Sequence, residues 1–247
     1  MPPAEAAPPE RARPSVPAPI SAARRALSEG LGTAFLVASV VGSGIMGERL
    51  AGGNLALALL ANSLASGAAL MALILAFGPV SGAHFNPLVT LAMAFKKQLH
   101  WKNVPAYLLA QAVGGLVGVG LTHVMFELPV VMTSRHSRTG GPQWVSEAIA
   151  TFGLLSVILG CAKARPAASA YAVGGYITAA YWFTSSTSFA NPVMTLSRAF
   201  TDTFSGIRPQ DVPGFIASQA VGAFLAIALF AWLWPLPESP DPVPEER

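Results

Sequence analysis

Charged residues are scarce in this chain: Asp, Glu, Lys and Arg together make up 11% of its 247 residues. A soluble domain contains roughly a quarter of such residues, whereas hydrophobic residues here reach 53%. The scarcity of charge therefore excludes an ordinary soluble domain and indicates a membrane protein. The formal net charge of +3 does not point to a nucleic-acid partner, because no basic stripe interleaved with aromatic residues accompanies it.

Cysteine is almost absent as well. The single Cys161 excludes an intramolecular disulfide and a cysteine metal cluster, and its apolar surroundings indicate a packing thiol. The sequence also lacks a recognisable nucleophile with its base, a metal-ligand set and a phosphate-binding loop. We therefore predict no enzyme activity and no bound cofactor or metal.

Both ends of the chain lack the apolar residues that would order them. Residues 1–25 open with a stretch rich in Pro and Ala, and residues 235–247 are similar, so we predict a disordered cytoplasmic tail and a second loose tail. The first tail has no continuous apolar segment of a secretory signal, so the helix that follows is expected to start membrane insertion and to be retained. One membrane domain, residues 26–234, lies between the tails.

Long apolar segments fill this domain, and each is about as long as a helix that crosses a hydrocarbon core of roughly 30 Å. They cover residues 26–47, 54–77, 104–126, 144–162, 168–186 and 212–234. Continuous rather than alternating apolar runs favour helices over a β-barrel. The sequence therefore predicts six membrane-spanning helices.

The flanking Lys and Arg residues predict the orientation, because they prefer the cytoplasmic side. With the N-terminus inside, ten lie on that side: Arg11, Arg13, Arg24, Arg25, Lys96, Lys97, Lys102, Lys163, Arg165 and Arg247. Five lie on the other side: Arg49, Arg135, Arg138, Arg198 and Arg208. We predict a multi-pass protein of the cell inner (plasma) membrane with both termini in the cytoplasm.

Two further apolar stretches, 85–95 and 190–200, are too short to span the membrane, and each opens with Asn-Pro. Asn is a good helix N-cap and Pro suits the first helical position. A half-helix can begin at membrane depth only where the chain leading to it is buried in protein or lines water. The stretches therefore indicate two re-entrant half-helices around a pore; the alternative is a pair of surface turns.

The two halves of the domain, about 26–126 and 144–234, repeat one another. The run SGAHFNPLVTLA is matched by SFANPVMTLSRA, EGLGTAFLVA by EAIATFGLLS, and PAYLLAQAVGG by PGFIASQAVGA. Each half holds three spans and one half-helix, so the second half must be inverted relative to the first. An inverted repeat places a site at the bilayer midplane, where both half-helix N-termini point.

These motifs resemble the signatures of the major intrinsic protein family, the aquaporins and aquaglyceroporins, over roughly residues 26–234. The resemblance implies an all-α membrane fold of six transmembrane helices plus two re-entrant half-helices in an inverted repeat. It also implies a homotetramer with one pore in each subunit. The run AYWFTSSTSFANP followed by TDTFSGIRP resembles a bacterial branch of the family that is associated with arsenic resistance.

The resemblance assigns the central constriction to Asn86, Pro87, Asn191 and Pro192. Each asparagine would offer a side-chain N–H to a passing solute. Each half-helix would also present roughly half a positive charge at its N-terminus. Aquaporin-type pores are a known example of cation exclusion by such dipoles, so a neutral solute is expected there.

Four other polar residues are candidates for a structural or a pore-lining role. By resemblance, Glu29 and Glu147 accept hydrogen bonds from the backbone of the re-entrant loops; the alternative is that each is an interfacial glutamate at the start of a span. His84 either lines the pore or packs within its loop. His123 is interpreted as a helix-packing residue.

The family's narrowest ring has four positions, one of which usually holds an Arg directly after the second motif. Met194 stands there instead, and counting along the motifs gives the complete ring as Ser66, Ala179, Ser188 and Met194. One inserted residue would move the second position to Thr178 or Ala180. This ring would contain no aromatic residue and no guanidinium, although Arg198, one turn further along, either leans back toward the pore or lies at the surface.

A wide, mildly polar ring with an adaptable methionine would admit more than water. The resemblance therefore implies a passive channel for small neutral solutes: arsenite in its trihydroxy form, and also methylated arsenicals, glycerol and water. Three alternatives stay open, namely an orthodox water channel, an ion-coupled secondary transporter and a non-conducting structural membrane protein. Membrane lipid and small neutral solutes are the expected partners.

Overall fold

The computed structural model describes residues 20–234. The predicted tails therefore lie largely outside the described residues, as do Arg11, Arg13 and Arg247. The first helix begins at Ala22, a few residues earlier than the predicted boundary at residue 26. Ser21 caps it, because its hydroxyl accepts a hydrogen bond from the backbone N–H of Arg24.

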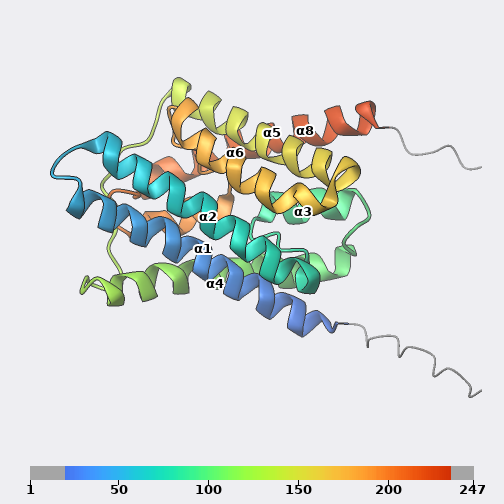
Figure 1. Cartoon of the computed structure of the whole chain (residues 1–247), viewed down its shortest axis with the longest axis horizontal. Coiled ribbons are helices and arrows are strands. Elements are labelled where there is room, and N and C mark those ends of the chain that lie inside the picture. The colour runs from blue at the N-terminus through green and yellow to red at the C-terminus, as the bar shows by residue number, and fades with distance from the viewer. Residues whose placement is uncertain (1–19, 235–247) are drawn as a thin grey trace, which may run out of the picture.

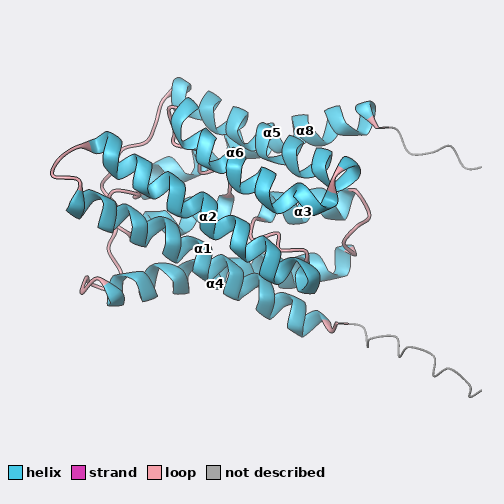
Figure 2. Cartoon of the chain, viewed as in Figure 1, coloured by secondary structure: helices cyan, strands magenta, loops and turns pink. Residues whose placement is uncertain are grey.

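All regular structure in residues 20–234 is helical, as Figure 2 shows. The six long helices are α1 (Ala22–Leu50), α2 (Leu55–Ser81), α4 (Val104–Met125), α5 (Gly141–Ala164), α6 (Ser169–Phe183) and α8 (Val212–Leu233). The two short ones are α3 (Pro87–Phe95) and α7 (Pro192–Ser197). The predicted all-α membrane fold is confirmed.

Five of the long helices are long and apolar enough to cross a membrane, whereas α6, with 15 residues, falls short of that length. It ends at Phe183 rather than at the predicted residue 186, because Thr184 is already extended (φ −110°, ψ 135°). The extended chain beyond it leads to the second half-helix. Residues that would lengthen the helix are thus used to enter the centre of the bundle.

The helices form one elongated bundle in which the start of α1 and the end of α8 lie at the same end, on the right in Figure 1. The loop at 126–140 lies at the opposite end. We call this opposite end the loop-covered mouth, because residues 126–140 and 201–208 pack together there. Two ends on the same side are what an even number of crossings requires.

Glycines let the long helices cross closely, in the same way in both halves. A Cβ added at Gly114 of α4 would lie 2.2 Å from the carbonyl oxygen of Gly30 in α1. A Cβ at Gly222 of α8 would lie 2.1 Å from that of Ala148 in α5. The pairs α1/α4 and α5/α8 are therefore repeat copies of one close-packed unit.

The loops that lead into α3 and α7 share an unusual backbone. Positive φ angles occur at Gly82, Ala83 and Phe85, and again 105 residues later at Thr187, Ser188 and Ala190. Left-handed conformations of non-glycine residues are costly and persist only where the surrounding structure holds them. The inverted repeat therefore extends to single backbone angles.

Candidate functional site

The two half-helices begin at the predicted asparagines. The side-chain oxygen of Asn86 accepts a hydrogen bond from Leu88 N at 2.9 Å. That of Asn191 accepts from Val193 N at 3.0 Å and from Met194 N at 3.3 Å. Both asparagines are N-caps whose following prolines occupy the first helical positions.

The same asparagines join the two halves of the molecule. Asn86 Nδ2 donates to the carbonyl of Ala190 at 2.8 Å, and Asn191 Nδ2 donates to the carbonyl of Phe85 at 2.8 Å. A side-chain amide carries two N–H groups, so each asparagine keeps one that these bonds do not use. Both residues line the same cavity, which lies at the meeting point of the two half-helices.

Glu29, fully buried in α1, holds the first loop. Its carboxylate accepts hydrogen bonds from the backbone N–H groups of His84 and Phe85, at 2.9 and 2.8 Å. It also accepts from the Ser81 hydroxyl at 2.6 Å and from Gln111 Nε2 at 2.8 Å. The non-helical backbone before α3 thus finds its acceptors inside the protein, as burial in a membrane requires.

Glu147, fully buried in α5, does the same for the second loop. Its carboxylate accepts from Phe189 N and Ala190 N, both at 2.9 Å, and from Gln219 Nε2 at 2.6 Å. Neither glutamate lines the cavity. The two carboxylates therefore face the loops rather than the pore.

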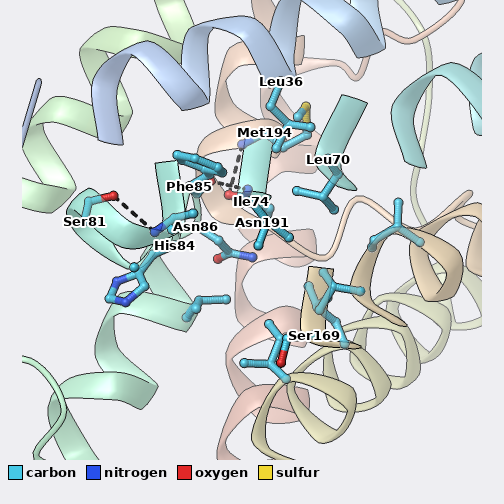
Figure 3. Close-up of a pocket in the computed structure, with 18 of the residues that line it drawn as sticks. Leu36, Leu70, Ile74, Ser81, His84, Phe85, Asn86, Ser169, Asn191 and Met194 are labelled. Carbon is cyan, nitrogen blue, oxygen red and sulfur yellow. Dashed lines mark hydrogen bonds between the residues drawn. The ribbon is translucent and has the colours of Figure 1, made fainter. Parts of the chain in front are cut away.

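The cavity has a volume of about 440 Å³. One wall is a stripe on α2 formed by Ser66, Leu70 and Ile74. Figure 3 shows Asn86 and Asn191 side by side in its wall, with His84 and Met194 on different sides of them. The cavity is thus mainly apolar with a few convergent polar groups, as is usual for sites that admit small molecules.

Comparison with known proteins identifies the family. The family model "Major intrinsic protein" matches residues 18–170. The chain belongs to the major intrinsic protein family. The members of this family are membrane channels and not enzymes, so the prediction that the chain is no enzyme is confirmed.

Several members of the major intrinsic protein family resemble the chain over most of its length. It is 51% identical to "Aquaglyceroporin AqpS" of Rhizobium meliloti (strain 1021), over 85% of this chain and 90% of that protein. It is 32% identical to "Aquaporin NIP2-1" of Oryza sativa subsp. japonica, over 81% and 76% respectively. The crystal structure of the aquaglyceroporin from Plasmodium falciparum has the same fold, with a TM-score of 0.66 at 22% identity over 86% of this chain and 95% of that one.

The structure brings three of the four predicted ring residues of this channel to the cavity. Ser66, Ser188 and Met194 line it, and each is at least nine-tenths buried. Ala179 does not line it and is exposed on α6. The structure therefore corrects the assignment of Ala179, and neither of the alternatives, Thr178 and Ala180, lines the cavity.

Helix geometry explains this correction. The cavity-facing residues of α6 recur every four positions, at Ser169, Val173, Ile177 and Tyr181. Ala179 is two residues from that stripe, or about 200° around the helix axis. Tyr181 lines the cavity and donates from its hydroxyl to Ser66 Oγ at 3.1 Å, which places an aromatic residue beside a predicted ring residue.

The two histidines considered from the sequence have different surroundings. His84 lines the cavity, with its Nδ1 3.1 Å from the Thr90 hydroxyl and its ring 5.4 Å from that of Tyr107; it therefore both packs in its loop and faces the cavity. His123 lies outside the cavity lining. Its Nδ1 is 3.0 Å from the Val130 carbonyl and its Nε2 is 2.8 Å from the Thr201 hydroxyl.

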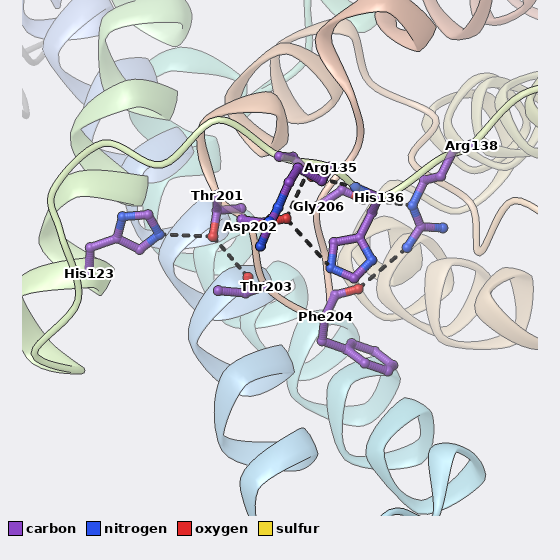
Figure 4. A network of polar contacts seen from close by, with 10 residues as sticks. His123, Arg135, His136, Arg138, Thr201, Asp202, Thr203, Phe204 and Gly206 are labelled. Carbon is purple, nitrogen blue, oxygen red and sulfur yellow. Dashed lines mark hydrogen bonds and ion pairs between the residues drawn. The ribbon is translucent and has the colours of Figure 1, made fainter.

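A polar network closes around the loop-covered mouth (Figure 4). Arg135 makes an ion pair with Asp202, with 2.7 Å between Nε and Oδ2, and its backbone N–H donates to the same carboxylate. These bonds hold the pKa of Asp202 below its ordinary value. Arg138 Nε donates to the carbonyl of Gly206 at 2.7 Å. The network fastens residues 126–140 to residues 201–208.

Sequence reasoning missed Tyr181 as a lining residue and left the position of Arg198 open. The four-residue spacing from Ser169 was the signal for Tyr181. For Arg198 the signal was its place four residues after Met194, since residues four apart share a helix face. Of the two placements that the sequence left open for Arg198, the structure shows the one toward the cavity.

Proposed function

We propose that this member of the major intrinsic protein family is an aquaglyceroporin-type passive channel for small neutral solutes, which conducts arsenite in its trihydroxy form and also methylated arsenicals, glycerol and water. The observation that carries the proposal is the single cavity in which both asparagine caps and three of the predicted ring residues meet. The resemblance to a bacterial aquaglyceroporin over most of both chains also supports it.

The chemistry of the cavity wall favours neutral solutes. Within residues 20–234 the wall contains no Asp or Glu. A permeating cation would therefore meet no opposite charge, and it would also face the positive ends of two half-helices. The acidic groups on which ion-coupled transport normally depends lie outside this wall, and the two glutamates closest to the loops already accept three or four hydrogen bonds each.

The polar groups suit hydroxylated molecules. The unused asparagine N–H groups and the hydroxyl of Ser66 can exchange hydrogen bonds with a solute, while Leu70 and Ile74 cover its apolar side. Trihydroxy-arsenic and glycerol are both small and carry several hydroxyls. Met194 is unbranched and adaptable, which suits a pore that accepts solutes of differing shape.

Roles, assembly and orientation complete the proposal. Asn86 with Pro87 and Asn191 with Pro192 form the central constriction, Glu29 and Glu147 serve as loop scaffolds, and the ring comprises Ser66, Tyr181, Ser188 and Met194. The subunits form a homotetramer in the cell inner membrane, with both termini in the cytoplasm. The common position of the two described chain ends (Figure 1) supports placing both termini on one side of the membrane.

Stopped-flow light scattering on proteoliposomes tests the function. Arsenite, glycerol and an impermeant sugar are compared as osmolytes, and rapid re-swelling is expected with the first two only. Met194→Arg adds a large fixed cation beside the asparagines, so re-swelling with arsenite and glycerol should fall at least about tenfold, equivalent to about 1.4 kcal/mol of barrier. Water flow should persist.

Met125→Arg is the matched control, because Met125 is exposed at the end of α4, outside the cavity wall. An arginine there can extend toward water, so re-swelling with arsenite and with glycerol should remain at the wild-type rate. Water flow without any solute entry in the wild-type protein would instead indicate an orthodox water channel. Flux that follows an ion gradient would indicate a coupled transporter.

A further inference from the structure

Arg198 occupies an unusual place for a charged residue. It follows the last turn of α7, four residues after Met194, so the two side chains share one face of the helix. Side chains of a helix lean toward its N-terminus, which directs Arg198 back toward the start of α7 rather than out to the surface. Both residues line the cavity, and Arg198 is only 2% exposed.

The charge of Arg198 is not neutralised by a carboxylate. Its Nε donates to the carbonyl of Ser205, and its guanidinium carbon lies 3.4 Å from the centre of the Phe189 ring. Among residues 20–234, the ion pairs within 4.0 Å are those of Asp202 and Asp211, and none includes Arg198. A buried, unpaired charge is costly and usually marks a functional position.

A second arginine at the same mouth shows what a structural arginine looks like here. Arg138 lies 5.1 Å from the same Phe189 ring, but all three of its guanidinium nitrogens donate, to the carbonyls of Gly206, Ser186 and Phe204. It does not line the cavity. For Arg198, the described chain provides an acceptor only to Nε. Its two terminal nitrogens are therefore available to a solute.

Two serines share the cavity wall with Arg198. Ser188 lines the cavity, but its hydroxyl oxygen is itself buried from solvent and has no hydrogen-bond partner within the described residues. Ser66 accepts from Tyr181 and keeps its own proton to donate. Ser66 can therefore donate to a solute in the cavity. In the first half the repeat places the neutral Met93, which also lines the cavity, at the position equivalent to Arg198.

We propose that Arg198 is the selectivity-determining cation of this pore, in place of the residue at 194. Its terminal N–H groups bind hydroxyl oxygens of a neutral solute, and its charge repels protons and small cations. The solute part of this assignment rests on the proposed channel function; cation exclusion does not. The other arginine in the wall, Arg25, belongs to the first turn of α1, at the opposite mouth.

Proton flux tests the assignment independently of arsenite. Proteoliposomes with a trapped pH-sensitive dye and a valinomycin-clamped potassium gradient report proton entry, and glycerol and water flow are measured on the same vesicles. Arg198→Met gives the second half the same residue that the first half has at the equivalent position, Met93. We expect proton flux to rise about 30-fold, the Boltzmann factor for two unit charges about 8 Å apart at an effective dielectric constant of about 20. Water flow in the same vesicles reports whether the variant channel is reconstituted.

Two further variants separate charge from loop attachment. Arg198→Lys keeps the charge and loses the planar stacking on Phe189, so its proton flux should stay within about threefold of wild type while glycerol flux falls. Arg138→Met weakens loop attachment at the same mouth and should not leak. Wild-type proton flux in Arg198→Met, or an equal leak in Arg198→Lys or Arg138→Met, would overturn the proposal and leave Arg198 as a loop anchor.

Two other outcomes also have a clear meaning. If wild-type vesicles conduct water but neither arsenite nor glycerol, the proposed solutes are wrong, and the proton data still decide the role of Arg198. If Arg198→Met does not reconstitute as a water-conducting protein, Arg198→Gln replaces it, because Gln keeps N–H donors and lacks the charge. A leak in Arg198→Gln supports the proposal, and its absence overturns it.

Discussion

The two halves of the pore have nearly the same frame and different linings. In both, a buried glutamate accepts hydrogen bonds from the last loop residues before the helix, and an asparagine caps the helix and crosses to the other half. The lining differs: Met93 in the first half corresponds to Arg198 in the second, and His84 to Phe189. Frame and lining have therefore diverged to different degrees.

Hydrogen bonding explains this difference. Non-helical backbone at membrane depth must find every partner within the protein, so the residues that supply those partners are fixed in both halves. A side chain that faces the cavity has no such obligation to the backbone. It can change in size or charge while the fold survives, so the selectivity of each mouth can be altered separately.

Removing the glutamates should disrupt the loop hydrogen bonds that the two halves share, and we expect this change to have the largest effect on stability. Glu29→Ala leaves four hydrogen-bond donors without their acceptor, and Glu147→Ala leaves three. Each buried unsatisfied donor costs about 1–3 kcal/mol. We expect the free energy of unfolding to fall by about 3 kcal/mol or more for each variant, and by more for Glu29→Ala. Unfolding by SDS titration, followed by circular dichroism, measures the difference.

Glu48→Ala is the control, because Glu48 lies on the same helix as Glu29 and is exposed. It should change stability by less than about 0.5 kcal/mol. Equal stability of all three variants would mean that water satisfies the loop N–H groups and that the buried carboxylates are dispensable.

The two halves also differ in the size of the residues that pack beneath the loops. In the first half Gly32 makes room for the fully buried ring of Phe85: a Cβ added at Gly32 would lie 2.0 Å from Cε1 of that ring. In the second half the equivalent positions hold Ala150 and Ala190, both fully buried. A large and a small residue in one half thus replace two small ones in the other.

Gly32→Ala should therefore destabilise the protein by about 1–3 kcal/mol, the usual cost of overpacking. In a Phe85→Ala background the same change should cost nothing, because it recreates the alanine pair of the second half. A double-mutant cycle on the free energy of unfolding gives this coupling directly. Additive effects of the two substitutions would show that the loop moves away and that the fit is not specific.

The elements that the sequence predicted well are those that the backbone dictates. Asn86, Asn191, Glu29 and Glu147 appear in matched positions of the two halves, because each supplies a partner that the chain requires. Matched repeats are visible without any structure. The prediction of the fold and of the loop motifs rested on them.

The lining was harder to predict, for two physical reasons. Helix α6 is apolar on all sides, so its pattern does not identify the pore face, and counting back through the irregular loop led to Ala179 instead of Tyr181. The direction of a long side chain depends on tertiary neighbours. The stacking of Arg198 on Phe189 and its bond to Ser205 come from contacts that spacing alone does not specify.

The loop-covered mouth gives the smallest predicted effect. Asp202 accepts two hydrogen bonds from Arg135, whose side chain is 89% exposed, so solvent screens the pair and it contributes less than about 1 kcal/mol. Its lowered pKa means that this contribution is present above the ordinary value of 3.8 and is lost as the pH falls through the folded-state value. Asp202→Asn should therefore cost less than about 1 kcal/mol at pH 7, and the gap between the variant and wild type should narrow below about pH 3.8. SDS titrations at pH 7 and pH 3 measure this gap. Arg135→Gln should show the same gap as Asp202→Asn at each pH. If the gap between variant and wild type were equally large at pH 7 and pH 3, the charge of the Asp202 carboxylate would not be what fastens the loops of this mouth.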